Sequence, residues 1–328
     1  MTLDFEKINY LLIGGAGFIG SHCARILANS TNNIITIYDN FCVGREWHIA
    51  DIADQDNVNV IKADIEHSST LGMAMKDVDI VYHFAANADI AKAMSEPTID
   101  FWQGTVLTQY VLEAMRKCGV SHMIFTSGSG VYGDLGDEPV IENRMARLPI
   151  SPYGAAKLGS EALIASYSHM FGIQAIIYRF ANVIGPYQTH GVGYDFVKQL
   201  LKNPSSLRIM GDGNQCKSYL YVDDVIDAIT FFNNFDLPPI NVFNVATNDY
   251  ITVREIADIV VDELGLYNVS YDCTGGTRGW KGDIPKVVFN TEKLREMGWS
   301  NNHTSADAMR LAVRSLIMDA KAGRFDDG

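Results

Sequence analysis

Hydrophobic positions along the first half of the chain follow two alternating patterns. Short apolar runs, too short for a core helix, are typical of buried strands; they are Ile8–Ile13, Ile34–Tyr38, Val58–Ile61, Ile80–Phe84, His122–Ser127 and Gln174–Phe180. Longer segments carry apolar residues at helical spacing; they are Ser21–Ala28, Thr105–Lys117 and Tyr153–Met170. Strands that alternate with helices predict an α/β fold with a doubly wound parallel sheet.

The pattern changes after Gly185-Pro186, where loops lengthen and strands become sparse. Helices are expected at Asp195–Lys202, Val222–Asn233, Thr252–Leu264 and Thr291–Met297. Thr252 and Glu255 have the spacing of a capping box, which fixes one helix start. The run Val242–Ala246 is typical of a strand that rejoins the first sheet. We therefore expect one domain over residues 1–185, with a returning strand near residues 240–247, and a smaller, mixed domain over residues 186–328.

Composition narrows the partners that the chain can have. The formal net charge of −13 argues against nucleic acid or an anionic membrane as the main partner. The five cysteines are scattered without a C-x-x-C pair, so we expect reduced packing residues and no metal site. The acidic N-terminal segment has no apolar core, and no run approaches the roughly 18 apolar residues of a membrane span. A cytoplasmic protein is the expectation.

Three glycines separate the first predicted strand from the first predicted helix. Gly14 permits a tight turn, Gly17 lets the backbone approach a phosphate, and Gly20 allows the helix to pack closely on its strand. The N-terminus of that helix then faces the anion. Asp39 ends the second strand, about 20 residues later, where a carboxylate binds the adenosine ribose and would repel a 2′-phosphate. This arrangement predicts a Rossmann-type domain that binds NAD in preference to NADP.

Tyr153 and Lys157 stand four residues apart near the start of a predicted helix, which places both side chains on one face. A phenol with a pKa of about 10 is a poor base at neutral pH. A nearby ammonium and the positive nicotinamide of NAD⁺ would stabilise the phenolate and make it a general base. An exposed tyrosine beside a solvated lysine is the alternative. The position of the pair after a dinucleotide-binding motif favours catalysis.

Six motifs spread along the chain belong together. They are GGAGFIGSH (Gly14–His22), Asp39-Asn40, Ala63-Asp64-Ile65, His83-Phe84-Ala85-Ala86-Asn87, Val131-Tyr132-Gly133 and Tyr153-x-x-x-Lys157. Together they are similar to the motifs of the extended short-chain dehydrogenase/reductase family. Within that family the chain most resembles the NAD-dependent nucleotide-sugar epimerase/dehydratase branch, and its 4-epimerases above all. The resemblance extends from about Ile8 to Trp299.

The resemblance implies which residues bind NAD. Asp64 and Ile65 would lie at the adenine, and Arg45 would approach the adenosine ribose, although Arg45 reads equally well as a solvated loop charge. Phe84, Ala85 and Ala86 would line the cofactor groove, or simply end a core strand. The whole predicted NAD-binding set is Gly14, Gly17, Phe18, Ile19, Gly20, Asp39, Asn40, Arg45, Asp64, Ile65, Phe84, Ala85, Ala86, Tyr153 and Lys157.

The second half supplies residues that the resemblance assigns to a nucleotide-sugar substrate. Asn182 matches a diphosphate-contacting asparagine. Lys217 stands where the family has an arginine that grips the diphosphate, and it offers a point charge instead of a bidentate fork. Arg278 matches a second diphosphate arginine, so two cations would bind the anion of a UDP- or GDP-linked sugar. The whole predicted substrate-binding set is Ser127, Ser129, Asn182, Val192, Lys217, Tyr219 and Arg278.

Two glycines depart from the family pattern. Gly128 occupies the position of a Ser or Thr that binds the sugar hydroxyl, so Ser127 or Ser129 must supply that hydroxyl, or the sugar oxygen relies on Tyr153 alone. We predict Ser127. Gly104 occupies the position of an Asn near the cofactor. These changes leave NAD binding intact and alter the surroundings of the sugar.

The expected reaction is NAD-dependent epimerisation of a nucleotide-diphosphate sugar at C4, through a 4-keto intermediate, with Tyr153, Lys157 and Ser127 as catalytic residues. A 4-dehydrogenase or reductase that releases a keto-sugar would use the same residues, and a non-catalytic NAD-binding sensor is a further alternative. Dehydratases carry acids where this chain has Ser129 and Gly130, neither of which titrates, so dehydration is disfavoured. The resemblance also implies a homodimer that pairs through the helices Thr105–Lys117 and Tyr153–Met170.

Overall fold

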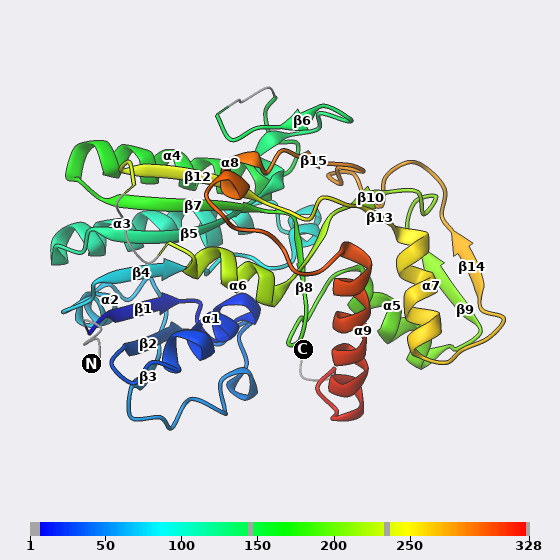
Figure 1. Ribbon diagram of the computed structural model, residues 1–328, viewed down its shortest axis with the longest axis horizontal. Helices are drawn as coiled ribbons and strands as arrows, with labels where there is room; N and C mark the ends of the chain where they lie inside the picture. The colour runs from blue at the N-terminus through cyan, green and yellow to red at the C-terminus, as the bar shows by residue number, and fades with distance from the viewer. Residues whose placement is uncertain (1–6, 144–146, 233–236, 326–328) are drawn as a thin grey trace. The chain divides into compact units, whose positions relative to one another are not determined.

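The computed structural model describes residues 7–143, 147–232 and 237–325 (Figure 1). The chain divides into two compact units that interleave along the sequence. Unit 1 comprises Met1–Gly128, Pro152–Arg179 and Ile229–Phe243, and unit 2 comprises Ser129–Ser151, Phe180–Ala228 and Asn244–Gly328. Among the helices of the described residues, none combines the length and the apolarity that a membrane crossing requires.

A seven-stranded sheet is the centre of unit 1, in the order β12-β7-β5-β4-β1-β2-β3 (Figure 1). Its strands are β1 Asn9–Ile13, β2 Ile34–Asp39, β3 Val58–Lys62, β4 Ile80–His83, β5 His122–Gly128, β7 Gln174–Phe180 and β12 Ile240–Val245. The order runs outward from β1 in both directions, and β1 to β5 pair in parallel. The predicted doubly wound α/β fold is confirmed. The six strands predicted in the first half all form, within two residues of the expected ends.

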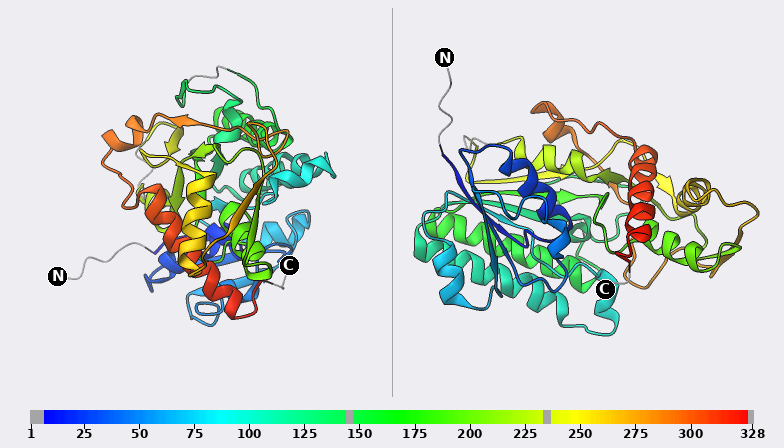
Figure 2. Two further views of the ribbon diagram at one scale, coloured as in Figure 1. Left: turned by 90° about the vertical axis from the view of Figure 1, so that its right-hand side faces the viewer. Right: turned by 90° about the horizontal axis from the view of Figure 1, so that it is seen from below.

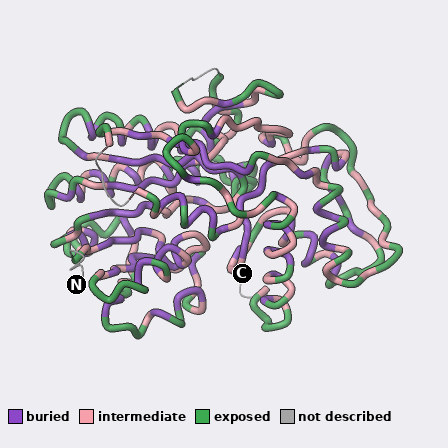
Figure 3. The backbone as a smooth tube through the Cα atoms, in the orientation of Figure 1, coloured by how far each residue is buried: buried purple, intermediate pink, exposed green. Residues whose placement is uncertain are grey.

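Helices cover both faces of this sheet (Figures 1 and 2). The α-helices that lie wholly in unit 1 are α1 Phe18–Ala28, α2 Ser68–Ala74, α3 Leu107–Cys118 and α4 Pro152–Phe171. Shorter helical turns are η1 Glu46–His48, η2 Ile90–Met94 and η3 Phe101–Val106. Except for the edge strand β3, the strands are buried along most of their length, as Figure 3 shows, because helices exclude water from both faces of the sheet. Strand residues such as Leu11, Val81 and Phe125 form the core with α3 and α4.

The start of α3 differs from the prediction. A regular helix was expected from Thr105, but Phe101–Val106 forms a π-helical segment that leads into α3. A side chain at Gly104, inside this segment, would have its Cβ 3.2 Å from the Cβ of Ala156 on α4. The missing side chain therefore lets the π-helical segment approach the first turns of α4. π-Helical turns inside longer helices often mark functional sites.

Unit 2 is held together by helices and four pairs of short strands. The pairs are β8 Asn182–Ile184 with β11 Tyr219–Tyr221, β9 Ser206–Ile209 with β14 Ser270–Cys273, β10 Cys216–Lys217 with β13 Ile251–Thr252, and β6 Pro139–Val140 with β15 Val288–Phe289. The helices are η4 Ser129–Tyr132, α5 Val192–Lys202, α7 Val253–Glu263, α8 Glu292–Glu296 and α9 Ser305–Lys321. Helix α6, Val222–Thr230, begins in unit 2 and ends in unit 1.

Two findings in unit 2 bear on the sequence patterns. The capping box is confirmed, since the Glu255 backbone N–H donates to the Thr252 hydroxyl at 3.1 Å and the Thr252 N–H donates to the Glu255 carboxylate at 2.6 Å. The helix expected over Val222–Asn233 ends at Thr230, and its predicted last residue, Asn233, lies outside the described residues. Helix α9 was not predicted; its apolar face packs into the unit 2 core with α5 and α7.

Candidate active site

The glycine turn of unit 1 has a shape that only glycine permits. Gly14 has a φ of +80°, and a Cβ there would lie 2.6 Å from the backbone nitrogen of Ala85. A Cβ on Gly20 would lie 2.3 Å from the carbonyl oxygen of Gly14. Helix α1 begins directly after Gly17 with no capping side chain and no acidic residue in its first turn. Its N–H groups and positive dipole end therefore suit a phosphate, and these residues fit the pyrophosphate of a dinucleotide.

Asp39 lies at the end of β2, beside this turn. Its carboxylate accepts the backbone N–H of Ala16 at 2.9 Å and that of Phe41 at 2.8 Å. Burial raises the pKa of Asp39, against the lowering effect of these backbone hydrogen bonds. Backbone hydrogen bonds, including one from Gly17, fix the carboxylate next to the glycine turn. That geometry fits a ribose diol and a preference for NAD over NADP.

The other predicted NAD-binding residues lie around the same edge of the sheet. Asn40 Nδ2 donates to the Asp64 carboxylate at 2.9 Å, which ties the ends of β2 and β3 together. Ile65 is buried in the core of unit 1, so any cofactor contact from it involves the backbone or the edge of its side chain. Arg45 donates to the carbonyl of Val43 in its own loop. Phe84, Ala85 and Ala86 follow β4 and are half-buried.

Helix α4 presents Tyr153 and Lys157 together, as their spacing predicted. The Lys157 ammonium donates to the carbonyl oxygen of Thr126 at 2.7 Å, and its Nζ lies 5.8 Å from the ring centroid of Tyr153. The Phe125 ring lies 4.9 Å from the same Nζ. Lys157 is only 5% exposed. A solvated lysine, the alternative reading of this residue, is thereby excluded.

Burial controls the protonation of both groups. It lowers the pKa of Lys157 to about 8, although the carboxylates of Glu161 and Asp100 act in the opposite direction. Burial, followed by the negative charge of Asp100, raises the pKa of Tyr153 to about 12. The ammonium and the nicotinamide of NAD⁺ together were expected to lower the pKa of Tyr153, and in the protein alone burial raises it. A phenolate at neutral pH therefore requires additional positive charge beside the ring.

Ser127, the predicted partner of the sugar hydroxyl, is 5% exposed at the end of β5. Its hydroxyl donates to the Glu161 carboxylate at 2.6 Å. Glu161 in turn forms a buried ion pair with Arg179, with distances of 3.0 Å to Nε and 2.6 Å to Nη2. The Ser127 proton is thus directed into the protein, and only the oxygen lone pairs remain for another partner.

In unit 2, both predicted diphosphate cations are paired with carboxylates. Lys217, on β10, contacts Asp283 Oδ1 at 2.5 Å. Arg278 pairs with the carboxylate of Asp134 and also donates to the backbone carbonyl of Asp283. Asp283 therefore contacts both cations and brings them into one cluster. The side chains of Lys217 and Arg278 are 26% and 37% exposed, which leaves them accessible to an incoming anion.

The remaining predicted substrate residues are distributed over unit 2. Asn182 is exposed, and its Nδ2 donates to the Ser218 carbonyl at 3.3 Å. It is the register partner of Tyr219, which is 5% exposed and belongs to the unit 2 core. Val192 begins α5 and packs against the same core. Ser129 is half-buried in η4. The structure brings Lys217 and Arg278 together, and core packing accounts for Tyr219 and Val192.

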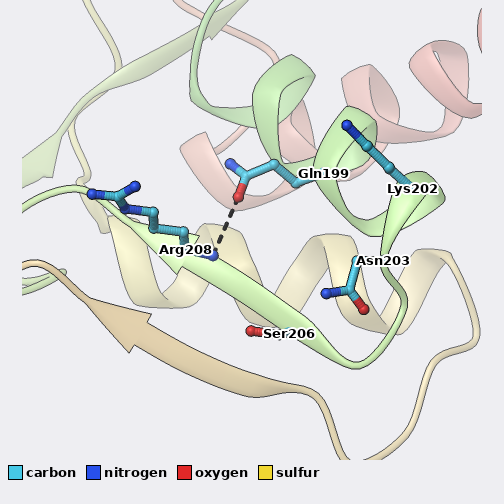
Figure 4. A pocket seen from close by; sticks show the side chains of 5 residues that line it. All are labelled: Gln199, Lys202, Asn203, Ser206 and Arg208. Atoms are coloured by element: carbon cyan, nitrogen blue, oxygen red, sulfur yellow. Dashed lines mark hydrogen bonds between the residues drawn. The ribbon is translucent and has the colours of Figure 1, made fainter.

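A pocket of about 340 Å³ lies elsewhere on unit 2, at the C-terminal end of α5 and the start of β9 (Figure 4). Gln199, Lys202, Asn203, Ser206 and Arg208 line it. The Gln199 side chain accepts the backbone N–H of Arg208 at 3.2 Å, as the dashed line in Figure 4 marks. None of the predicted site residues lines this pocket, and the negative end of the α5 dipole disfavours an anion there.

Four charged residues near the candidate groups were not assigned roles from the sequence. Glu161 stands four residues after Lys157, a spacing that puts the two on one helix face and could have identified it. Asp283 forms an ion pair with Lys217 and Asp134 forms one with Arg278, and in both cases the partners lie too far apart in sequence for spacing to indicate the pairing. Asp100 is 2% exposed; Asn87 Nδ2 donates to its Oδ1 at 2.9 Å, and its Oδ2 has no hydrogen-bond partner in the described parts of the chain.

Comparisons with known proteins agree with this geometry. Residues 10–246 match the model of the NAD dependent epimerase/dehydratase family. A putative UDP-glucose 4-epimerase of Methanocaldococcus jannaschii is 32% identical over 295 residues, which is 88% of this chain and 92% of the relative. The predicted resemblance and the predicted NAD cofactor are confirmed.

Two solved structures extend the likeness to nearly the whole chain. The Thermotoga maritima UDP-glucose 4-epimerase, solved with UDP-glucose, has a TM-score of 0.84 and 28% identity, and the match covers 95% of this chain and 100% of that one. The Thermus thermophilus UDP-glucose 4-epimerase, solved with NAD, has a TM-score of 0.81 and 27% identity over 94% of this chain and 99% of that one. The chain belongs to the NAD-dependent epimerase/dehydratase family.

Proposed function

We propose that the protein is an NAD-dependent epimerase that inverts a nucleotide-diphosphate sugar, UDP-linked by preference, at C4. One observation carries the proposal: α4 holds the Lys157 ammonium, fixed at 2.7 Å from the Thr126 carbonyl, with its Nζ 5.8 Å from the Tyr153 ring centroid. Family membership and the relatives named UDP-glucose 4-epimerase support this reading. A non-catalytic sensor has no need of a buried ammonium beside a phenol.

In the proposed mechanism, bound NAD⁺ would supply a reversible hydride acceptor for the sugar carbon and, in its oxidised form, a positive charge beside the phenol. Tyr153 takes the proton of the sugar hydroxyl and later gives it back to the keto oxygen. Lys157 binds the nicotinamide ribose and stabilises the phenolate. The added charge matters because burial raises the pKa of Tyr153 to about 12 in the protein alone.

Lys217 and Arg278 are proposed to bind the diphosphate. They are the two cations that Asp283 brings into one cluster, and their partners are carboxylates that an anion can replace. A sugar that is anchored through its diphosphate keeps its ring free to turn and present the opposite face. Inversion requires this rotation between the two hydride transfers.

The first test incubates the purified protein separately with UDP-glucose, UDP-galactose and the corresponding GDP-sugars. An epimer mixture in the proton NMR spectrum, without net formation of NADH at 340 nm, is the expected result. Release of a keto-sugar with stoichiometric NADH would favour the 4-dehydrogenase reading instead.

The Tyr153→Phe variant tests the assignment of the base. Loss of the phenol hydroxyl should reduce turnover by about 10²–10⁴-fold and leave NAD bound. Tyr267→Phe, at a tyrosine that is 86% exposed in unit 2, is the matched control and should retain full activity. A Tyr153→Phe enzyme with near-normal turnover would refute the mechanism.

We also propose that the protein forms a homodimer through η3, α3 and α4. These segments of unit 1 expose large hydrophobic side chains, at Phe101, Trp102, Tyr110, Met170 and Phe171. Apolar side chains gathered on a surface commonly mark a protein–protein interface. Light scattering after size-exclusion chromatography should give twice the chain mass, and Trp102→Glu should shift it toward the monomer.

A further inference from the structure

A buried polar network joins α4, β5 and β7 of unit 1, one helical turn along α4 from Lys157. The carboxylate of Glu161, on α4, accepts two hydrogen bonds of 2.6 Å each. One comes from the hydroxyl of Ser127 at the end of β5, and the other comes from the guanidinium of Arg179 on β7. The side chains of Glu161 and Arg179 are each 6% exposed. Hydrogen bonds to charged groups in such dry surroundings are among the stronger ones in proteins.

The network is connected to the lysine through the backbone. Lys157 donates at 2.7 Å to the carbonyl oxygen of Thr126, the residue that precedes Ser127. Glu161 lies one helical turn after Lys157 on α4. The Glu161 carboxylate thus connects the end of β5 to α4, the helix that carries Lys157. The Thr126 carbonyl, which accepts the Lys157 ammonium, lies next to this connection in the chain.

Titratable groups on three further elements interact with Lys157 or with Glu161. Asp100, before η3, raises the pKa of Lys157, as Glu161 does. His83, at the end of β4, has its pKa lowered to about 3 by burial and by the Lys157 charge, and is therefore neutral at physiological pH. Arg179, on β7, is paired with Glu161. Glu161 and Asp100 are thus the two groups that keep this buried ammonium charged.

We propose that Glu161 is a positioning residue for the proposed epimerase reaction. Through its bonds to Ser127 and Arg179, Glu161 holds the Thr126 carbonyl against the Lys157 ammonium. Ser127 then acts through Glu161, because its proton is committed to that carboxylate. This inference rests on the proposed function of Tyr153 and Lys157, and it replaces direct binding of the sugar hydroxyl as the role of Ser127.

The choice of variants follows from the ion pair. Glu161→Gln alone would leave a buried guanidinium without its counter-charge, which destabilises proteins strongly. The double variant Glu161→Gln/Arg179→Gln removes both charges together and keeps amides of similar size. The matched control is Glu113→Gln/Arg116→Gln, which removes a partly exposed ion pair from α3 in the same unit.

The first measurement follows Lys157 directly. In protein labelled with [¹³Cε]lysine, the Lys157 resonance is identified by its loss in Lys157→Arg, and its shift is recorded against pH. The midpoint should fall by about one pH unit in the Glu161/Arg179 double variant. Glu161, and not Arg179, raises the pKa of Lys157, and the Thr126 carbonyl that accepts the ammonium loses the tie that holds it. The control variant should leave the midpoint unchanged. An unchanged midpoint in the double variant would overturn the proposal.

The second measurement uses the NAD-bound enzyme and a smaller change. Ser127→Ala breaks the tie to β5 but preserves the ion pair, and it should lower kcat several-fold with KM for the nucleotide sugar unchanged. Ser127→Thr, which keeps the hydroxyl, should restore kcat. A rise in KM with kcat intact would instead show direct sugar binding by Ser127 and overturn the proposal. The NMR titration needs no turnover, so failure of the epimerase assignment would be seen separately.

Discussion

The candidate-site cation of unit 1, Lys157, and those of unit 2, Lys217 and Arg278, are held in opposite ways. In unit 1, Lys157 is 5% exposed and donates to a neutral backbone carbonyl, while the nearby Glu161 has its own partner in Arg179. In unit 2, Lys217 and Arg278 are 26% and 37% exposed and pair directly with carboxylates. The first arrangement fixes a charge before any ligand arrives. In the second arrangement, a carboxylate already neutralises each cation before any ligand arrives.

The difference has a physical basis in solvation. A buried ammonium loses the water that stabilises it, and this is why the pKa of Lys157 falls to about 8. Partly exposed ion pairs keep much of their hydration, and each contributes only about 0–1 kcal/mol. The Asp134 side chain is 25% exposed, so a diphosphate can displace it from Arg278 at small cost. The Asp283 side chain is only 9% exposed, and like the charges around α4 it cannot be left without a partner cheaply.

The largest expected effect comes from removing the fixed charge. Lys157→Met should lower turnover by about 10²–10⁴-fold, because Tyr153 loses the cation that supports its phenolate. Lys92→Met, at an exposed lysine of unit 1 that pairs with Glu96, is the control and should be fully active. Steady-state assays of both variants at pH 7 test this. Comparable activity in the two would mean that Lys157 is only a packing residue.

A second effect of the same substitution concerns stability against pH. The folded pKa of Lys157, about 8, lies below its ordinary value of 10.5, so the unfolded chain binds more protons between these two pH values. The contribution of Lys157 to the free energy of unfolding therefore rises with pH from about 8 to 10.5, by about 3 kcal/mol at most. Urea unfolding should show this rise in the wild type relative to Lys157→Met. Parallel pH curves for the two proteins would contradict it.

Removing a cation from unit 2 should weaken substrate binding without affecting the cofactor. Arg278→Gln should raise the Kd for UDP by about 10–100-fold, since it loses charge-assisted bonds to a diphosphate. NAD affinity, measured by calorimetry on the same sample, should stay the same. Lys286→Gln, which removes an exposed cation paired with Asp137 in the same unit, is the control. An equal loss in both variants would indicate a general charge effect only.

The smallest effect tests whether the ion pairs of unit 2 really exchange. Asp134→Asn removes the carboxylate that pairs with Arg278, so a diphosphate no longer has to displace it. UDP should therefore bind about 2–5-fold more tightly. The gain should shrink as salt is added. Asp137→Asn, at the partner of Lys286, should leave the Kd unchanged. Weaker binding by Asp134→Asn would mean that this carboxylate orients Arg278 for the ligand.

The sequence predicted unit 1 more fully than unit 2, and the reason is the distance along the chain over which each pattern acts. The strands, the glycine turn and the Tyr153/Lys157 spacing are local signals, and the structure reproduces each of them. Helix α9 was missed although its apolar positions face the core of unit 2. The short strand pairs of unit 2 are two to four residues long, too short for periodicity to reveal.

The charged partners could not be predicted for a different reason. Asp134 lies 144 residues before Arg278, and Asp283 lies 66 residues after Lys217. No periodicity spans such separations, and burial of Asp100 depends on how η3 meets α4. The direction of the Ser127 hydroxyl is likewise set by Glu161 and not by the neighbours of Ser127 in sequence.

Asp283 links the positions of the two cations of unit 2, Lys217 and Arg278. Its carboxylate contacts Lys217 and accepts the backbone N–H of Gly279 at 3.1 Å, while its carbonyl oxygen receives Arg278. The six-residue segment from Arg278 to Asp283 therefore sets the distance between the two cations. Lengthening or shortening this segment by one residue would therefore move both cations together, and with them the whole of the proposed diphosphate site.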